Sequence, residues 1–190
     1  YTSQNWLTLP KGTTAERMPV LGGVNATSAR GVFGGGYSTS DIEYIQISTL
    51  GNSSEFGDRA HANLGRPASL SSSTRGLFAG GFASPAFSNT IDYITITSTG
   101  NGKDFGDMTD ALWSRAGCSN SVRGIIAGGS DAANHNIIEH LIIATTGNSQ
   151  DFGDLTRARR ELGGSSSTTR GIFIGGRSPV PSGTDNDENI

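Results

Sequence analysis

A short pattern recurs four times along the chain and constrains its fold more than any other feature. Each copy has an Arg-Gly pair, a short apolar run and a Gly-Gly pair. The copies read ARGVFGGG (29–36), TRGLFAGG (74–81), VRGIIAGG (122–129) and TRGIFIGG (169–176). Their arginines, spaced 45, 48 and 47 residues apart, are Arg30, Arg75, Arg123 and Arg170. A nearly constant period of this length is the signature of a repeat architecture.

A second block follows each of the first three copies. The blocks read DIEYIQISTLGNSSEFGD (41–58), TIDYITITSTGNGKDFGD (90–107) and IIEHLIIATTGNSQDFGD (137–154). Each contains an Ile-acid-aromatic core, with histidine as the third residue in the last block, then Gly-Asn and Phe-Gly-Asp. Both blocks keep the same order and nearly the same separation, so chance similarity is very improbable.

Each repeat predicts three or four β-strands. The run between Arg-Gly and Gly-Gly is short, rich in β-branched and aromatic residues and closed by glycines, which favours a buried strand over a helix. The Ile-Asp-Tyr-Ile-Thr-Ile-Thr run predicts a second strand that ends in a turn at Gly-Asn. A unit of this size cannot bury both faces of its sheet alone, so neighbouring units must stack on it. The repeat length therefore predicts a β-propeller.

Composition supports an all-β chain and excludes several partners. The 190 residues include 28 glycines and are only 34% hydrophobic, which disfavours a helical bundle because interior glycines destabilise helices. The net charge is −3 and the basic residues are scattered, so we expect no nucleic-acid partner. Apolar runs are far shorter than the roughly 20 residues of a membrane helix, so we expect no membrane insertion. Cys118 is the only cysteine, and its small neighbours indicate a buried filler.

The blocks resemble the kelch repeat. The matching parts are the apolar strand 77–81 that ends in Gly-Gly, the acid and aromatic at Asp92 and Tyr93, Phe105, and the run through Arg115. The resemblance covers roughly residues 20–190. It departs from the kelch pattern where tryptophan is usual, because this chain has phenylalanine, and His140 replaces the tyrosine of the third unit. The phenylalanines are Phe56, Phe105 and Phe152.

This variant of the repeat also resembles kelch-like repeats in tail-fibre and other structural proteins of bacteriophages. The segment LPKGTTAERMP (9–19) is similar to pieces of phage fibre proteins. The resemblance implies a virion or extracellular location.

The repeats predict one domain, 1–190, of about four blades. The predicted blades are 30–74, 75–122, 123–169 and a split blade made of 1–29 and 170–190. Trp6 would take the place of the repeated phenylalanine in the split blade. The sequence stops at Ile190, where the next Ile-acid-aromatic strand should begin. Either residues beyond an end supply this strand, or a neighbouring subunit completes the blade and generates a ring or filament.

The repeated charged residues have two interpretations. Besides the four arginines, the aspartates of Phe-Gly-Asp recur as Asp58, Asp107 and Asp154. The favoured interpretation is structural, with each arginine bound to an aspartate or to strand-end carbonyls. The alternative is a ring of arginines that binds an anion. The Gly-Gly pairs are interpreted as strand ends that need a positive φ or a close backbone approach, not as a phosphate-binding loop.

The loops after each Gly-Gly pair are the predicted binding surface. They differ in length between repeats and read YSTS (37–40), FASPAFSN (82–89) and SDAANHN (130–136). Loops carried by a rigid scaffold often hold binding residues. Their aromatic rings would either stack on sugar rings or pack on the neighbouring blade. The candidate binding residues are Tyr37, Phe82, Phe87, Asp131 and His135.

Other candidate residues have ordinary interpretations. His61 and His135 are expected in exposed loops, and no histidine spacing fits a metal site. An acidic tail is favoured over a calcium site for Asp185, Asp187 and Glu188. Two glycosylation patterns begin at Asn25 and Asn52. We expect no metal and no cofactor.

The expected function is that of a non-enzymatic structural or adhesion module in a virion fibre or extracellular assembly. Its partners would be other structural proteins, copies of itself or a cell-surface glycan, bound through the loops after Gly-Gly. One alternative is a filament or ring subunit whose incomplete blade is completed by the next copy. A propeller enzyme of the oxidase or sugar-isomerase type is disfavoured, because no set of unrepeated polar residues converges.

Overall fold

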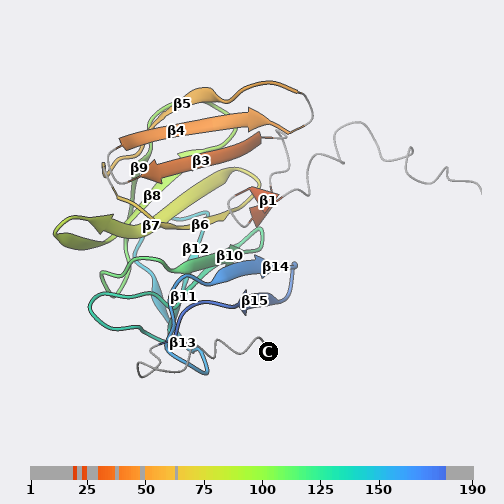
Figure 1. Ribbon diagram of the computed structural model, residues 1–190. Helices are drawn as coiled ribbons and strands as arrows, with labels where there is room; N and C mark the ends of the chain where they lie inside the picture. The colour runs from red at the N-terminus through yellow and green to blue at the C-terminus, as the bar shows by residue number, and fades with distance from the viewer. Residues whose placement is uncertain are drawn as a thin grey trace, which may run out of the picture.

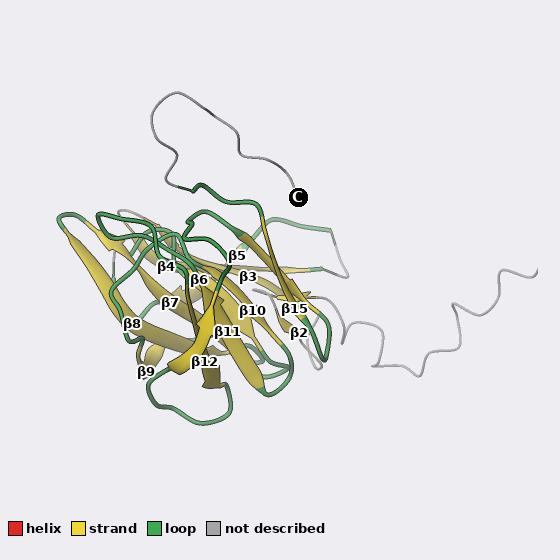
Figure 2. Ribbon diagram, turned by 90° about the horizontal axis from the view of Figure 1, so that it is seen from below, coloured by secondary structure: helices red, strands yellow, loops and turns green. Residues whose placement is uncertain are grey.

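The computed structural model describes residues 19–20, 23–24, 30–36, 39–47, 50–62 and 64–178 (Figure 1). Every regular element in these ranges is a β-strand, and all strand pairs are antiparallel, which confirms the predicted all-β class. Figure 2 shows strands and loops only. In the described part of the chain, no helix has the length and apolar character needed to cross a membrane.

Two complete four-stranded sheets form the middle of the molecule. We call the three-stranded sheet that precedes them in the chain the first sheet, and these two, in chain order, the second sheet (β6-β7-β8-β9) and the third sheet (β10-β11-β12-β13). The strands of the second sheet are β6 (Ala68–Ser71), β7 (Arg75–Ala83), β8 (Ala86–Thr95) and β9 (Lys103–Asp107). The strands of the third sheet are β10 (Ala116–Ser119), β11 (Arg123–Ala127), β12 (Ile137–Ile142) and β13 (Gln150–Asp154).

Smaller sheets lie on either side of this pair in chain order (Figure 1). A three-stranded sheet precedes it, with β3 (Arg30–Gly36), β4 (Thr39–Gln46) and β5 (Ser54–Asp58). A two-stranded sheet follows it, with β14 (Gly163–Ser166) and β15 (Gly171–Ile174). A short pair, β1 (Pro19–Val20) and β2 (Gly23–Val24), forms a separate two-stranded sheet that lies beside β6. The described sheets form an open series, and no closed ring is present among them.

The boundaries of the sheets differ from those of the predicted repeats, which were taken to start at the arginines. Each four-stranded sheet starts with the strand before Arg-Gly, so a cut at Arg75 separates β6 from β7 and a cut at Arg123 separates β10 from β11. The predicted blade ranges therefore divide hydrogen-bonded sheets. The cause is the Ser/Thr-rich stretch before each arginine, which forms a strand although it carries few apolar residues.

The first strands of successive sheets lie side by side. The Ser71 N–H donates to Oγ of Ser119, whose hydroxyl donates back to the Ser71 carbonyl. Ser166 repeats both bonds with the main chain of Ser119. The strands approach so closely that a Cβ at Gly117 would lie 2.3 Å from the carbonyl oxygen of Ser69. Only glycine fits this position.

The core lies between the sheets. Val32, Ile42 and Phe56 of the first sheet pack on Phe78, Ile94 and Ile96 of the second, and all six are buried. A second cluster joins the second and third sheets in the same way and contains Ala68, Leu70, Leu77, Ala79, Ile91, Phe105, Met108, Ile126, Leu141 and Ile143. Burying each large apolar side chain contributes roughly 1.5–3 kcal/mol, so the contacts between sheets dominate the stability of the repeat.

Candidate functional site

The Gly-Asn and Phe-Gly-Asp motifs of consecutive sheets bind each other. The Gly100 N–H donates to the Phe56 carbonyl at 2.7 Å, and the Asp58 N–H donates to Oδ1 of Asn101 at 3.1 Å. The Gly102 N–H donates to the Asp58 carbonyl at 2.7 Å. We call this set of contacts the sheet junction. Residues 100–102 belong to one repeat and residues 56–58 to the repeat before it, so the motifs join neighbours.

The next pair of sheets repeats the sheet junction. The Gly147 N–H donates to the Phe105 carbonyl at 2.8 Å, and the Asp107 N–H donates to Oδ1 of Asn148 at 3.0 Å. Gly106 has φ of 144°, and a Cβ there would lie 2.6 Å from the carbonyl carbon of Gly147. Glycine is therefore required in Phe-Gly-Asp, both by its backbone conformation and by the turn packed on it.

Two of the four repeated arginines also connect the sheets. Nη1 of Arg30 donates to the Ile96 carbonyl at 2.8 Å, and Nη1 of Arg75 donates to the Ile143 carbonyl at 3.0 Å. Each guanidinium also lies 4.6 Å from the centre of the tyrosine ring in its own sheet. These contacts are with strand-end carbonyls and not with the repeated aspartates. The other two repeated arginines, Arg123 and Arg170, are exposed.

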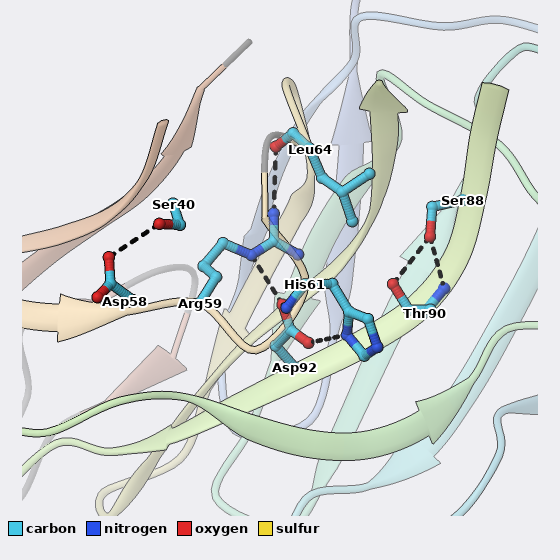
Figure 3. A network of polar contacts seen from close by, with 8 residues as sticks. All are labelled: Ser40, Asp58, Arg59, His61, Leu64, Ser88, Thr90 and Asp92. Atoms are coloured by element: carbon cyan, nitrogen blue, oxygen red, sulfur yellow. Dashed lines mark hydrogen bonds and ion pairs between the residues drawn. The ribbon is translucent and has the colours of Figure 1, made fainter. Parts of the chain in front are cut away.

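The acid of the Ile-acid-aromatic core forms a buried ion pair with the preceding linker. Asp92 accepts from Nε of Arg59 at 2.9 Å and contacts Nδ1 of His61 at 2.5 Å (Figure 3). Both charged side chains of the Arg59–Asp92 pair are fully buried. Burial lowers the pKa of Arg59, and Asp92 opposes that shift. His61, expected in an exposed loop, is instead half-buried because it reaches this carboxylate.

Glu139 occupies the equivalent position in the next sheet. It pairs with Arg115, and both side chains are fully buried. Its Oε1 also accepts the Thr109 N–H at 2.7 Å, and its carboxylate is within hydrogen-bonding distance of the Thr109 and Ser149 hydroxyls. Burial lowers the pKa of Arg115, and the charge of Glu139 raises it. The carboxylate is thus fully partnered, as a buried charge requires.

Aromatic pairs confirm the role of His140 as a substitute for tyrosine. Tyr44 and Tyr93 meet the phenylalanines of their own sheets edge to face, at 6.0 Å between ring centroids. His140 meets Phe152 in the same way at 5.9 Å. The phenylalanines differ in burial, because Phe56 and Phe105 are 2% and 3% exposed whereas Phe152 is 53% exposed. The difference follows from what covers them: the first two lie under the next sheet.

The predicted loop aromatics Phe82 and Phe87 lie together at the end of the β7-β8 hairpin. Their ring centroids are 5.2 Å apart, and Trp113 from the following linker lies 5.6 Å from Phe82 and 6.4 Å from Phe87. The Arg66 guanidinium lies 4.8 Å from the centre of the tryptophan ring. All three rings are only partly buried. We call these four side chains the aromatic cluster.

A hollow of about 340 Å³ adjoins the aromatic cluster. Arg66, Ser114 and Glu161 line it, each just before the first strand of a sheet, together with Pro67, Arg115 and Leu162. The first three have φ of 54°, 54° and 60°, and main-chain bonds link Ser114 to Arg66 and Glu161 to Ser114. Nη1 of Arg66 also binds Glu161 at 3.1 Å. Left-handed backbone at three equivalent non-glycine positions is a feature often found at functional sites.

Asp131 and His135 contact each other within the next loop. Nε2 of His135 lies 3.0 Å from Oδ1 of Asp131, and the Ala133 N–H donates to the same oxygen at 2.9 Å. The hydrogen bond from Ala133, followed by that from His135, lowers the pKa of Asp131 to about 2. Asp131 is exposed. The pair therefore orders its loop and leaves a carboxylate at the surface.

Several other candidate residues named from the sequence are not part of these contacts. Tyr37, Asn25, Trp6 and the acidic tail, Asp185, Asp187 and Glu188, lie outside the described residues. Asn52 is exposed in the Gly-Asn turn of the first sheet. Cys118 is buried as expected, and burial raises the pKa of its thiol to about 11. Within the described ranges, no group of three or more His, Cys, Asp or Glu side chains is placed to hold a metal ion.

Sequence reasoning missed Trp113 and Arg66. Both lie in the linkers between repeats, where no shared pattern draws attention to them. One feature of the sequence could have drawn attention to Trp113: it is one of only two tryptophans in a chain whose repeats use phenylalanine. The chain matches no protein-family model, and no curated protein matches it in sequence.

Proposed function

We propose that this chain is a non-enzymatic adhesion and structural module of a virion fibre or extracellular assembly, built on a kelch-like β-propeller. Support for a propeller comes from the stacked antiparallel sheets and from the side-by-side arrangement of their first strands. Propeller blades pack face to face around a central channel. The side-by-side contacts of β6 with β10 and of β10 with β14 support such packing.

The aromatic cluster carries the proposed adhesion. Two phenylalanine rings and a tryptophan ring, all partly exposed, offer apolar faces on which sugar rings stack, and Arg66 and Glu161 beside them offer hydrogen-bond partners for hydroxyl groups. The hollow next to the cluster is large enough for a sugar unit. A surface glycan is the ligand class that best matches this combination. A loop of a surface protein is the second candidate ligand.

A glycan array and a cell-surface pull-down test this proposal. The unmodified chain should bind a defined set of glycans or one surface protein, and Phe87→Ala or Trp113→Ala should weaken binding at least about tenfold, the loss of roughly 1.4 kcal/mol expected for one stacked ring. Phe152→Ala is the matched control, because this exposed ring lies in a different sheet and should leave binding unchanged. Blank results with the unmodified chain in both assays would overturn the adhesion proposal.

A second candidate function is assembly into a filament or ring. The observation that favours it is that the described sheets form an open series and not a closed ring. Heterologous contacts between copies then generate rings or open filaments. Light scattering over a range of concentrations tests this function. A mass that stays near the 19.7 kDa of one chain at all concentrations would contradict it.

A further inference from the structure

The linker between the second and third sheets contains buried hydrogen-bond donors that have no acceptor. Oγ of Ser114, and Nε and Nη2 of Arg115, are buried without a hydrogen-bond partner within the described residues. Nε1 of the adjacent Trp113 is also buried without one. Ser114 and Arg115 are each 5% exposed, and both line the hollow beside the aromatic cluster. Buried polar groups are normally paired, so unpaired donors in three consecutive residues favour a ligand that is rich in acceptors.

Arg115 presents a complete edge of its guanidinium to such a ligand. Its Nη1 contacts the Glu139 carboxylate and lies 3.3 Å from the sulfur of Met108, which fixes the position of the group. Nε and Nη2, the two nitrogens without partners, lie side by side on the other edge. Two parallel N–H groups of this kind match the two oxygens of a carboxylate or of another oxyanion.

The one carboxylate that lines the hollow is already surrounded by arginines. Oε1 of Glu161 accepts from Nη1 of Arg66 at 3.1 Å and lies 3.9 Å from Nε of Arg160. Its Oε2 lies 3.8 Å from Nε of Arg177. Glu161 is therefore engaged with cations, and the remaining polar side chains that line the hollow are donors.

The charges of these contacts sum to a positive value. The pair of Arg115 with Glu139 is neutral in itself, and the three arginines around Glu161 exceed its single negative charge by two. The exposed Asp110, which interacts electrostatically with Arg115, reduces the excess to one. A positive site attracts an anionic ligand and not a cationic one.

We propose, building on the adhesion function above, that the hollow binds the anionic group, a carboxylate or a sulfate, of an acidic sugar whose ring stacks on the aromatic cluster. Ser114 and the free edge of Arg115 donate to the oxygens of this group. Arg66 serves both parts of the site, because it lines the hollow and its guanidinium lies 4.8 Å from the centre of the Trp113 ring. The ligand class of the adhesion site is therefore an acidic glycan.

A glycan array with matched pairs tests this site. It carries oligosaccharides that end in a uronic acid, each beside the same oligosaccharide with the carboxyl group reduced to an alcohol. It also carries sulfated oligosaccharides beside their desulfated forms. The unmodified chain should bind the acidic member of at least one pair at least about tenfold more tightly than the neutral member, and the type of pair identifies the anionic group.

Two variants connect the preference for acidic glycans to the hollow. Ser114→Gly removes the hydroxyl but accepts the φ of 54°, and it should weaken binding of the acidic glycan about tenfold with little effect on the neutral one. Arg66→Gln should lower the ratio of acidic to neutral affinity at least about tenfold. Arg123→Gln is the matched control, because Arg123 is exposed, does not line the hollow and should leave the ratio unchanged.

The possible outcomes separate the anion site from the adhesion function. Equal affinity for acidic and neutral members, or an acidic preference that both Ser114→Gly and Arg66→Gln leave unchanged, would overturn the anion site. Binding of the neutral glycans would still retain adhesion. Binding of no glycan would also overturn the anion site, and the cell-surface pull-down then decides separately whether adhesion to a protein remains. Thermal unfolding of each variant establishes that it is folded.

Discussion

The main-chain N–H of Gly147 donates to the carbonyl oxygen of Phe105 at 2.8 Å, although the two residues belong to different repeats. The bond shows what the two most regular motifs of the sequence do. Gly-Asn and Phe-Gly-Asp occur in the same block of the first three repeats, yet the turns at Gly100 and Gly147 bind the Phe-Gly-Asp motif of the preceding repeat. The motifs therefore specify how sheets are joined, and the following variants test that role.

Removing the amide of Asn148 should destabilise the chain. Its Oδ1 accepts the Asp107 N–H, so Asn148→Ala should lower the free energy of unfolding by about 1 kcal/mol, the usual net value of one hydrogen bond. Asn52→Ala is the matched control, because Asn52 has no such partner within the described residues and should cost less than about 0.5 kcal/mol. Urea unfolding of both variants measures the difference, and equal losses would argue against the junction.

Replacing the glycine of Phe-Gly-Asp by alanine should destabilise the chain more at Gly106 than at Gly153. Gly106 and Gly153 have similar φ values of 144° and 137°, so Ala strains the backbone at both positions. Only at Gly106 does the added Cβ also meet the backbone of Gly147. Gly106→Ala should therefore be less stable than Gly153→Ala by roughly 1–3 kcal/mol, the usual cost of overpacking. Thermal unfolding of the pair tests this, and identical midpoints would contradict it.

Breaking the buried ion pair should be costly, and removing both charges should not. Arg115→Met leaves the Glu139 carboxylate buried without its cation and should destabilise the chain by about 3–5 kcal/mol. The double variant Arg115→Met with Glu139→Gln should recover a large part of this loss, because no unpaired charge is left. Denaturant unfolding of the single and double variants gives the coupling. Additive losses would show that the pair does not act as a unit.

The loop at Asp131 should loosen only in strong acid. Its pKa is lowered from 3.8 to about 2, so its contribution is complete above pH 4 and is lost as the pH falls through 2. His135→Ala should raise the titration midpoint but leave it below 3.8, because the Ala133 N–H still donates to the carboxylate. Carboxyl chemical shifts measured against pH give the midpoints. A midpoint near 3.8 in the unmodified chain would refute the assigned contacts.

The sequence correctly predicted the order of the strands, because an apolar run bounded by glycines indicates a strand even when the strands that pair with it are unknown. The strand before each arginine was missed as the start of a sheet, since its serines bind the neighbouring backbone instead of filling a core. The repeated arginines were recognised, but spacing alone did not decide between aspartates and carbonyls as their partners. The loop aromatics were found as well. Their contact with Trp113 was not, because the tryptophan lies in a linker and tertiary packing alone brings it to the hairpin.

The sheet junction is tested most directly by amide hydrogen exchange in a dilute solution of the chain. The account predicts slow exchange of the Gly100 and Gly147 amides, which donate to Phe56 and Phe105. It predicts fast exchange of the Gly51 amide in the equivalent turn of the first sheet, which has no main-chain acceptor within the described residues. Protection of all three glycine amides to the same degree, or of none, would contradict it.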